Sequence, residues 1–371
     1  MGWERLVEGT ESARQRFADR LAQRMVDGLV GPPGWFLRRR LDRLLAVLLA
    51  LPVHLVTVVL LLVGVWLLAD GQNWLLRILG GVSLLAGLVT LPRLPRRPEH
   101  VALLVRAEAP ELFGLLDELA TPVGTTSPDE VLVIADYNAF ASRVGIRRRA
   151  LGIGAPLWTA ADSGTRAFIL GHELGHFAHH DLTQGLLVGG ALETLNHWRD
   201  IATPGDASLF DIATAPIRGV LIGYQLAIYF VAAPSHRRSE LFADLAAARA
   251  VGTPAAVRAL ELMLAVDALD VAANRAAVHR DRPDMADVLR AAGRRSEEMR
   301  AGDRARGRAE HTRIDQSHPT TAERLRLLES RAAAEPEIAV AEERMARVDM
   351  ELEPRLEAAL KRLGEAYRHV R

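Results

Sequence analysis

The sequence predicts a mainly α-helical protein with a small β-sheet and a transmembrane helical hairpin. Three observations support this fold class. Residues 44–69 form an uncharged, mostly apolar run that is long enough to cross a bilayer. Apolar residues at helical spacing and helix-capping signals recur through much of the remaining chain. Only two short segments, residues 130–134 and 150–158, have the composition of strands.

Composition narrows the possible functions. The chain has 371 residues, which is enough for one large domain with appendages or for two domains. Its formal net charge is zero, which argues against a nucleic-acid partner bound through bulk positive charge. It has no cysteine, so any zinc must be held by histidines and carboxylates, a ligand set more typical of catalytic than of structural sites.

The amino-terminal segment, residues 1–40, contains an amphipathic helix from about Thr10 to Val30, and Gly31-Pro32-Pro33-Gly34 ends it. This helix either packs on the rest of the protein or lies on an anionic membrane surface. Residues 41–98 form the predicted hairpin. Its two spans, about 44–69 and 74–91, are joined by the polar link at residues 70–73.

Arginines predict the orientation of this hairpin. They flank it on both sides, whereas the link contains neither lysine nor arginine; the flanking arginines are Arg38, Arg39, Arg40, Arg43, Arg93, Arg96 and Arg97. Positive charge is retained on the cytoplasmic side of membranes. We therefore expect a multi-pass protein of the cell (inner) membrane, in contact with the lipid bilayer, with everything beyond Pro98 in the cytoplasm.

The main chemical signal is His172-Glu173-Leu174-Gly175-His176, which has the His-Glu-x-x-His pattern of zinc hydrolases. On a helix, His172 and His176 share one face and can bind one Zn²⁺. The ion lowers the pKa of a water, and Glu173 is placed to take the proton as that water attacks a carbonyl group. Asp162 or Ser163 is expected to cap this helix.

A third protein ligand is expected downstream, in a helix that begins after Pro234 with Ser235 as its cap. In this helix Glu240 and Asp244 lie four residues apart on one face. Glu240 can bind the metal, and Asp244 can accept a hydrogen bond from the far nitrogen of a ligating histidine. The alternative is a solvated helix face on which both carboxylates pair with neighbouring arginines.

The ordered set of motifs resembles the HtpX-like membrane metallopeptidases, the group that includes CAAX prenyl endopeptidases and Oma-type proteases. Besides His-Glu-Leu-Gly-His and Arg-Arg-Ser-Glu240-x-x-x-Asp244, the resemblance rests on Asn138-Ala139-Phe140-Ala141, Leu151-Gly152-x-Gly154-x-Pro156-Leu157 and Ser317-His318-Pro319-x-x-x-x-Arg324-Leu325. It covers about residues 99–328 and implies a zincin-like, gluzincin-type catalytic domain, which we place at residues 99–334. We expect a charged helix at residues 335–371 to follow and to dock on that domain; the alternative, a coiled-coil arm in a dimer, is disfavoured by its short apolar seam.

The resemblance also implies roles for individual residues. His172, His176 and Glu240 would bind one Zn²⁺ per chain, Glu173 would be the general base, and Asp244 would orient a ligand. His318 and Arg324 would lie near the cleft and stabilise the oxyanion or bind substrate. The second strand would form an open edge for a peptide, with the substrate-binding residues Asn138, Gly152, Gly154 and Pro156; the alternative is an ordinary sheet strand.

One departure from the resembled family concerns the membrane part. The family carries a further hydrophobic hairpin between the motif helix and the third ligand, whereas residues 219–233 offer only about fifteen apolar residues. We interpret this segment as a buried or membrane-edge helix.

The sequence thus predicts a membrane-anchored zinc endopeptidase that cleaves proteins or peptides, and the resemblance implies a role in membrane-protein quality control. It indicates no oligomeric state. Two other functions remain open: a catalytically silent membrane scaffold with a structural zinc site, and a zinc amidase of small substrates. Glu173 argues against the scaffold, because a structural site has no use for a base beside the metal.

Overall fold

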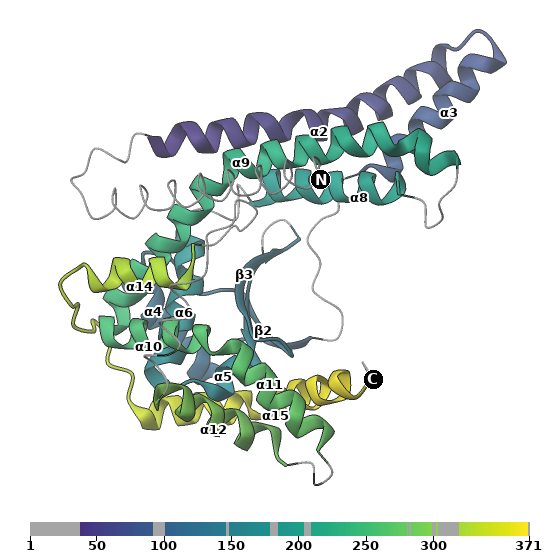
Figure 1. Cartoon of the computed structure of the whole chain (residues 1–371). Helices are drawn as coiled ribbons and strands as arrows, with labels where there is room; N and C mark the ends of the chain where they lie inside the picture. The colour runs from purple at the N-terminus through teal and green to yellow at the C-terminus, as the bar shows by residue number, and fades with distance from the viewer. Residues whose placement is uncertain are drawn as a thin grey trace, which may run out of the picture. The chain divides into compact units, whose positions relative to one another are not determined.

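The structure is a computed structural model. It describes residues 38–91, 101–145, 148–178, 185–203, 209–279, 281, 283–298, 302 and 319–369. The predicted amino-terminal helix and His318 lie outside these residues. The described chain is mostly helical and carries one small sheet, as the sequence predicted (Figure 1). The sheet has four strands, whereas the sequence indicated only two. It divides into two compact units: residues 33–94 with 182–236, and residues 95–181 with 237–371.

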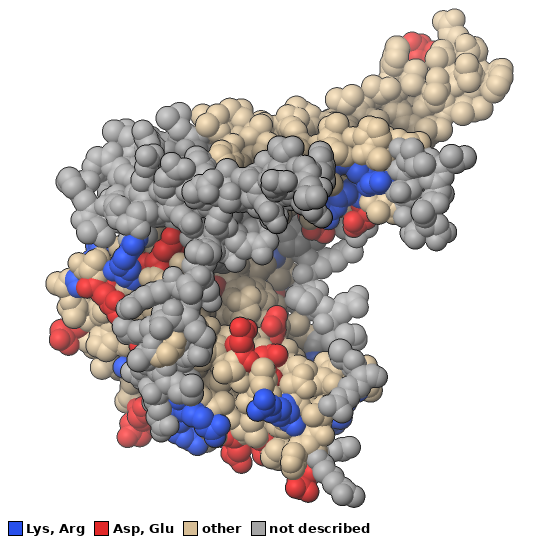
Figure 2. All heavy atoms as spheres, viewed as in Figure 1, with Lys and Arg blue, Asp and Glu red and all other residues tan. Residues whose placement is uncertain are grey.

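The first of these units, the hairpin unit, contains α2 (Arg38–Asp70), α3 (Trp74–Val89), a π-helical turn (Gly185–Gly189), α8 (Gly190–Ile201) and the first part of α9 (Leu209–Val251). Helices α2 and α3 form the predicted hairpin. Asn73 caps α3 by accepting from the backbone N–H of Leu76, and Arg77 reaches back to the carbonyl of Gly71 in the link. Figure 2 shows the hairpin surface as almost free of charge.

Among the described residues, two helices are long and apolar enough to cross a membrane, namely the segments Arg43–Asp70 and Ala213–Val251; α3 is apolar but shorter. The second segment differs from the prediction. Residues 219–233 belong to the continuous 43-residue helix α9, and no new helix begins at Ser235. Pro234 lies inside α9. Proline has no backbone N–H and so removes one hydrogen bond of the helix, but the backbone hydrogen bonds of the neighbouring turns keep α9 continuous.

The second unit, the catalytic unit, is built around the sheet. Its strands are β1 (Ala102–Leu104), β2 (Glu130–Ile134), β3 (Ala139–Val144) and β4 (Arg148–Gly154). They lie in the order β1-β2-β4-β3, with β2 and β4 parallel and the outer pairs antiparallel. Gly145, with φ of 64°, adopts the left-handed conformation at the end of β3.

The helices of this unit are α4 (Pro110–Val123), α5 (Ala155–Ala160), α6 (Ser163–Ala178), the carboxyl part of α9, α10 (Thr253–Leu264), α11 (Val266–Val278), α12 (Met285–Glu298), α14 (Thr321–Glu329) and α15 (Glu342–His369). The predicted capping box at Thr320 and Glu323 opens α14. Helix α15 docks with a buried apolar face, as predicted for the terminal helix. It belongs to the same compact unit as α6, whose fold therefore continues past residue 334.

The sheet corrects two predictions. The strand predicted at residues 150–158 spans Arg148–Gly154, and residues 155–158 lie in helix α5 instead. Strand β4 was expected to offer an open edge through Gly152 and Gly154, but it lies between β2 and β3. Its glycines serve packing, because a Cβ at Gly152 would overlap the ring of Phe140, and one at Gly154 would overlap the carbonyl oxygens of Asp136 and Asn138. Pro156 is buried in the first turn of α5, and Asn138 is exposed just before β3.

Candidate metal centre

The candidate metal centre lies where α6 and the carboxyl part of α9 cross. Asp162 caps α6, accepting from the N–H of Thr165 at 2.6 Å, so this helix begins where the sequence predicted. The helix then carries His172, Glu173 and His176, while α9 carries Glu240 and Asp244.

Small residues set the distance between the two helices. A Cβ at Gly175 would lie 2.8 Å from the Cα of Ala243, and one at Gly171 would lie 3.3 Å from the Cβ of Ala247. Both pairs follow a spacing of four residues, which places them on one face of each helix. This close approach brings Glu240 within reach of both histidines. The sequence analysis did not use this signal, although the four small residues can be read from the sequence.

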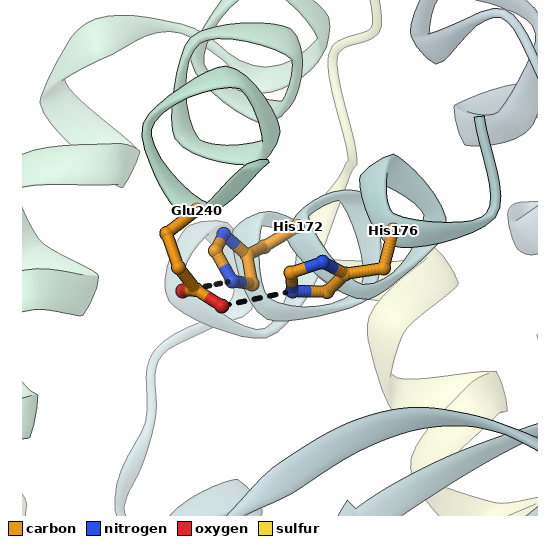
Figure 3. Close-up of side chains that lie close together, drawn as sticks. All are labelled: His172, His176 and Glu240. Atoms are coloured by element: carbon orange, nitrogen blue, oxygen red, sulfur yellow. Dashed lines mark ion pairs between the residues drawn. The ribbon is translucent and has the colours of Figure 1, made fainter. Parts of the chain in front are cut away.

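The predicted ligands converge on one point (Figure 3). One carboxylate oxygen of Glu240 lies 3.5 Å from Nε2 of His172, and the other lies 3.4 Å from Nε2 of His176. The ligand atoms of all three residues lie within 4.8 Å of one another. Ligands bound tetrahedrally to zinc at about 2.0–2.1 Å are about 3.3 Å apart, so these spacings fit one ion.

Asp244 is completely buried behind His172 and lies 3.0 Å from Nδ1 of that ring. The imidazole therefore donates from Nδ1 to Asp244 and presents Nε2 towards Glu240. Burial lowers the pKa of His172, but hydrogen bonds with Asp244 and Glu240 outweigh it and raise that pKa to about 10. The two carboxylates thus favour positive charge at this position, which a divalent cation also supplies.

Arg324 lies in a different environment from the one we predicted. Its guanidinium is buried and donates to both carboxylate oxygens of Asp244, at 2.6 and 2.7 Å. A bidentate pair of this kind fixes the orientation of the carboxylate. Since Asp244 in turn contacts His172, the three side chains form a chain that ends at a candidate ligand.

Glu173 is also buried, with 6% of its surface exposed. In the part of the chain that the structure describes, its carboxylate makes no hydrogen bond or ion pair. A cleft of about 710 Å³ in the same unit lies elsewhere, between α12 and α15, and shares no lining residue with the three candidate ligands.

Comparisons with known proteins identify the family of this chain. The sequence model of peptidase family M48 matches residues 106–332. Over 79 residues the chain is 33% identical to a protein named Protease HtpX homolog 1 from Sulfurisphaera tokodaii; the match spans 21% of this chain and 25% of that protein. No solved structure matches. The family match covers more than half of the chain and includes every candidate ligand, and the predicted resemblance is confirmed: this chain belongs to peptidase family M48.

Proposed function

We propose that this protein is a zinc-dependent endopeptidase in which His172, His176 and Glu240 bind one Zn²⁺. The observation that carries the proposal is the convergence of these three side chains, because the spacing of their ligand atoms suits a tetrahedral ion with one position left open. Membership of a metallopeptidase family supports the same assignment.

Zinc held by these residues would act as a Lewis acid, lowering the pKa of a water and polarising the scissile carbonyl group. The proton acceptor is Glu173 on the motif helix, which takes the proton from the attacking water. Its carboxylate makes no hydrogen bond or ion pair among the described residues, which leaves it available to accept that proton.

Asp244 and Arg324 would position the ligands. Asp244 fixes the tautomer of His172 by accepting from Nδ1, and Arg324 prevents the carboxylate of Asp244 from rotating. This assignment replaces the oxyanion or substrate-binding role that the sequence suggested for Arg324, because both arms of its guanidinium are engaged inside the protein.

The substrates would be proteins or peptides. An extended peptide could add to β3, which ends the sheet among the described strands and contacts α6. The two apolar helices support a membrane anchor, and the arginine pattern supports a cytoplasmic catalytic unit. The resemblance to HtpX-like peptidases supports a role in membrane-protein quality control, with damaged or misassembled membrane proteins as substrates.

The test pairs zinc content with casein cleavage by the full chain in detergent. We expect Glu173→Gln to retain one zinc per chain and to lose at least about 1,000-fold in kcat, since it removes the base while keeping the shape of the side chain. Glu240→Ala should lose the metal.

Three results would contradict the proposal or one of its assignments. Wild-type protein that binds zinc and cleaves no protein, with Glu173→Gln behaving identically, would favour the scaffold. Cleavage restricted to small amides would favour the amidase. Full zinc content in Glu240→Ala would show that another residue is the third ligand.

A further inference from the structure

Helix α15 lies outside residues 106–332, the part of the chain that matches the family, and yet it packs with buried apolar residues, among them Val348 and Leu352. Its acidic side chains reach the first turns of helices in the catalytic unit. Glu342 accepts from Ser163 at the start of α6. Asp349 and Glu351 each accept two hydrogen bonds, from different partners. The inference below rests on this difference: the partners of Asp349 lie in α5 and the motif helix, whereas those of Glu351 lie in α4.

Asp349 joins α5 to the motif helix. One of its oxygens accepts from the indole N–H of Trp158 at 2.9 Å, and the other accepts from Nη1 of Arg166 at 2.5 Å. Arg166 also donates through Nε to the carbonyl of Trp158 at 2.9 Å, and its guanidinium lies 5.3 Å from the centre of the Trp158 ring. The Arg166 side chain is 13% exposed and that of Asp349 is 37% exposed, so the guanidinium is largely withdrawn from water while the carboxylate lies at the wall of the cleft between α12 and α15.

Arg166 lies on the face of α6 that carries the proposed base. Arg166 and Glu173 are seven residues apart, which is about two helical turns, so the two side chains project in nearly the same direction. The contact of Gly171 and Gly175 with α9 restrains a different side of the helix. The two restraints together fix the rotation of α6 about its own axis.

We propose that Asp349 is a positioning residue for peptide hydrolysis: through Arg166 it sets the rotation of α6 and thereby the direction in which Glu173 points. The inference rests on the proposed function of Glu173. Helix α15 would then contribute to catalysis, although it lies beyond the residues that match the family.

Glu351 provides the matched control. Its carboxylate accepts from the backbone N–H groups of Glu111 and Leu112, both at 2.9 Å. It thereby caps α4, whose own N-cap residue, Ala109, makes no side-chain cap. Both carboxylates lie on α15 and accept two hydrogen bonds, but α4 carries no candidate site residue. If loss of stability alone lowers activity, substitutions of Asp349 and of Glu351 should therefore lower kcat to the same extent.

The experiment compares Asp349→Asn and Glu351→Gln in the full-length protein. We expect both to lower the melting temperature by a few degrees. Asp349→Asn should lower kcat for a fluorogenic peptide about tenfold, with KM and zinc content within twofold of wild type, because a small error in the position of a catalytic group costs rate rather than binding. Glu351→Gln should keep kcat within twofold.

Two further readouts separate positioning from stability. The double variant Arg166→Gln/Asp349→Asn should be no slower than the slower single variant, because both changes remove the same joint. Amide hydrogen exchange should accelerate in α6 for Asp349→Asn and in α4 for Glu351→Gln.

Equal effects of the two single variants on kcat, or additive losses in the double variant, would overturn the role of Asp349 while the peptidase assignment stands. An inactive wild-type protein would instead overturn the proposed function, and the role of Asp349 with it.

Discussion

Helices α6 and α9 of the catalytic unit meet through glycines, and so do helices α2 and α3 of the hairpin unit. In the catalytic unit, Gly171 and Gly175 of α6 face alanines of α9. In the hairpin unit, a Cβ at Gly80 of α3 would lie 2.9 Å from the Cβ of Leu67, and Gly64 and Gly87 make similar approaches. In both places the absence of a side chain allows two backbones to come close.

The surroundings of the two contacts differ. Beside the α6–α9 contact lie His172, Asp244 and Arg324, all buried and joined by hydrogen bonds or ion pairs. Around the hairpin contact most side chains are apolar, and many are exposed, such as Leu62 and Leu85. A small shift of the hairpin would exchange one apolar contact for another, whereas the same shift in the catalytic unit would leave buried charges without partners.

The largest effect is expected at Arg324. Replacing it by leucine leaves the carboxylate of Asp244 buried without its cation, which should cost about 3–5 kcal/mol of unfolding free energy and most of the bound zinc. Arg324→Lys keeps the positive charge but loses the bidentate geometry, so its losses of stability and of zinc should be smaller than those of Arg324→Leu. Urea unfolding and metal analysis measure both effects. A stable Arg324→Leu variant with full zinc and reduced kcat would restore the oxyanion role.

A second, smaller effect compares the glycines directly. Gly175→Ala forces α6 and α9 apart and should cost about 1–3 kcal/mol, with weaker zinc binding. Gly80→Ala should destabilise the hairpin unit and leave zinc binding unchanged. Gly81→Ala has no atom within 4 Å of the added Cβ, and should be neutral or stabilising because alanine favours helix. The comparison fails if Gly80→Ala and Gly175→Ala weaken zinc binding equally.

The smallest effect is expected at the cap of the motif helix. Burial raises the pKa of Asp162, but hydrogen bonds from Thr165 and the ion pair with Arg258 outweigh it and lower that pKa. A lowered carboxylate pKa contributes stability above its unfolded value of about 3.9, and this contribution is lost as the pH falls through the folded pKa.

Asp162→Ala should therefore cost about 1 kcal/mol at pH 7 and progressively less below pH 4. Asp162→Asn retains a capping oxygen and should cost less than Asp162→Ala at pH 7. Thermal melts of the three proteins between pH 3 and pH 7 measure the difference. A cost of Asp162→Ala that stays constant over this range would exclude the charged cap.

Local signals in the sequence predicted where helices lie and begin better than they predicted which elements pair or pack together. The apolar runs, the cap at Asp162 and the capping box at Thr320 depend on residues close in the chain, and each was found where expected. The place of β4 inside the sheet was missed because strand order depends on pairing between distant segments.

The contact of Arg324 was missed for a related reason. Its spacing from Pro319 is the same whether the guanidinium faces a cleft or a buried carboxylate, and only the fold brings Asp244 to it, 80 residues away in sequence. Likewise, Pro234 suggested a helix start, yet the turns of α9 on either side continue the helix through it.

The central claim is that α6 and α9 together build one zinc site, and the zinc K-edge X-ray absorption spectrum of the purified full-length protein tests it most directly. The account predicts one zinc per chain with two imidazoles and one carboxylate at about 2.0–2.1 Å, and loss of the carboxylate in Glu240→Gln. A spectrum with a third imidazole, or one unchanged in Glu240→Gln, would contradict it.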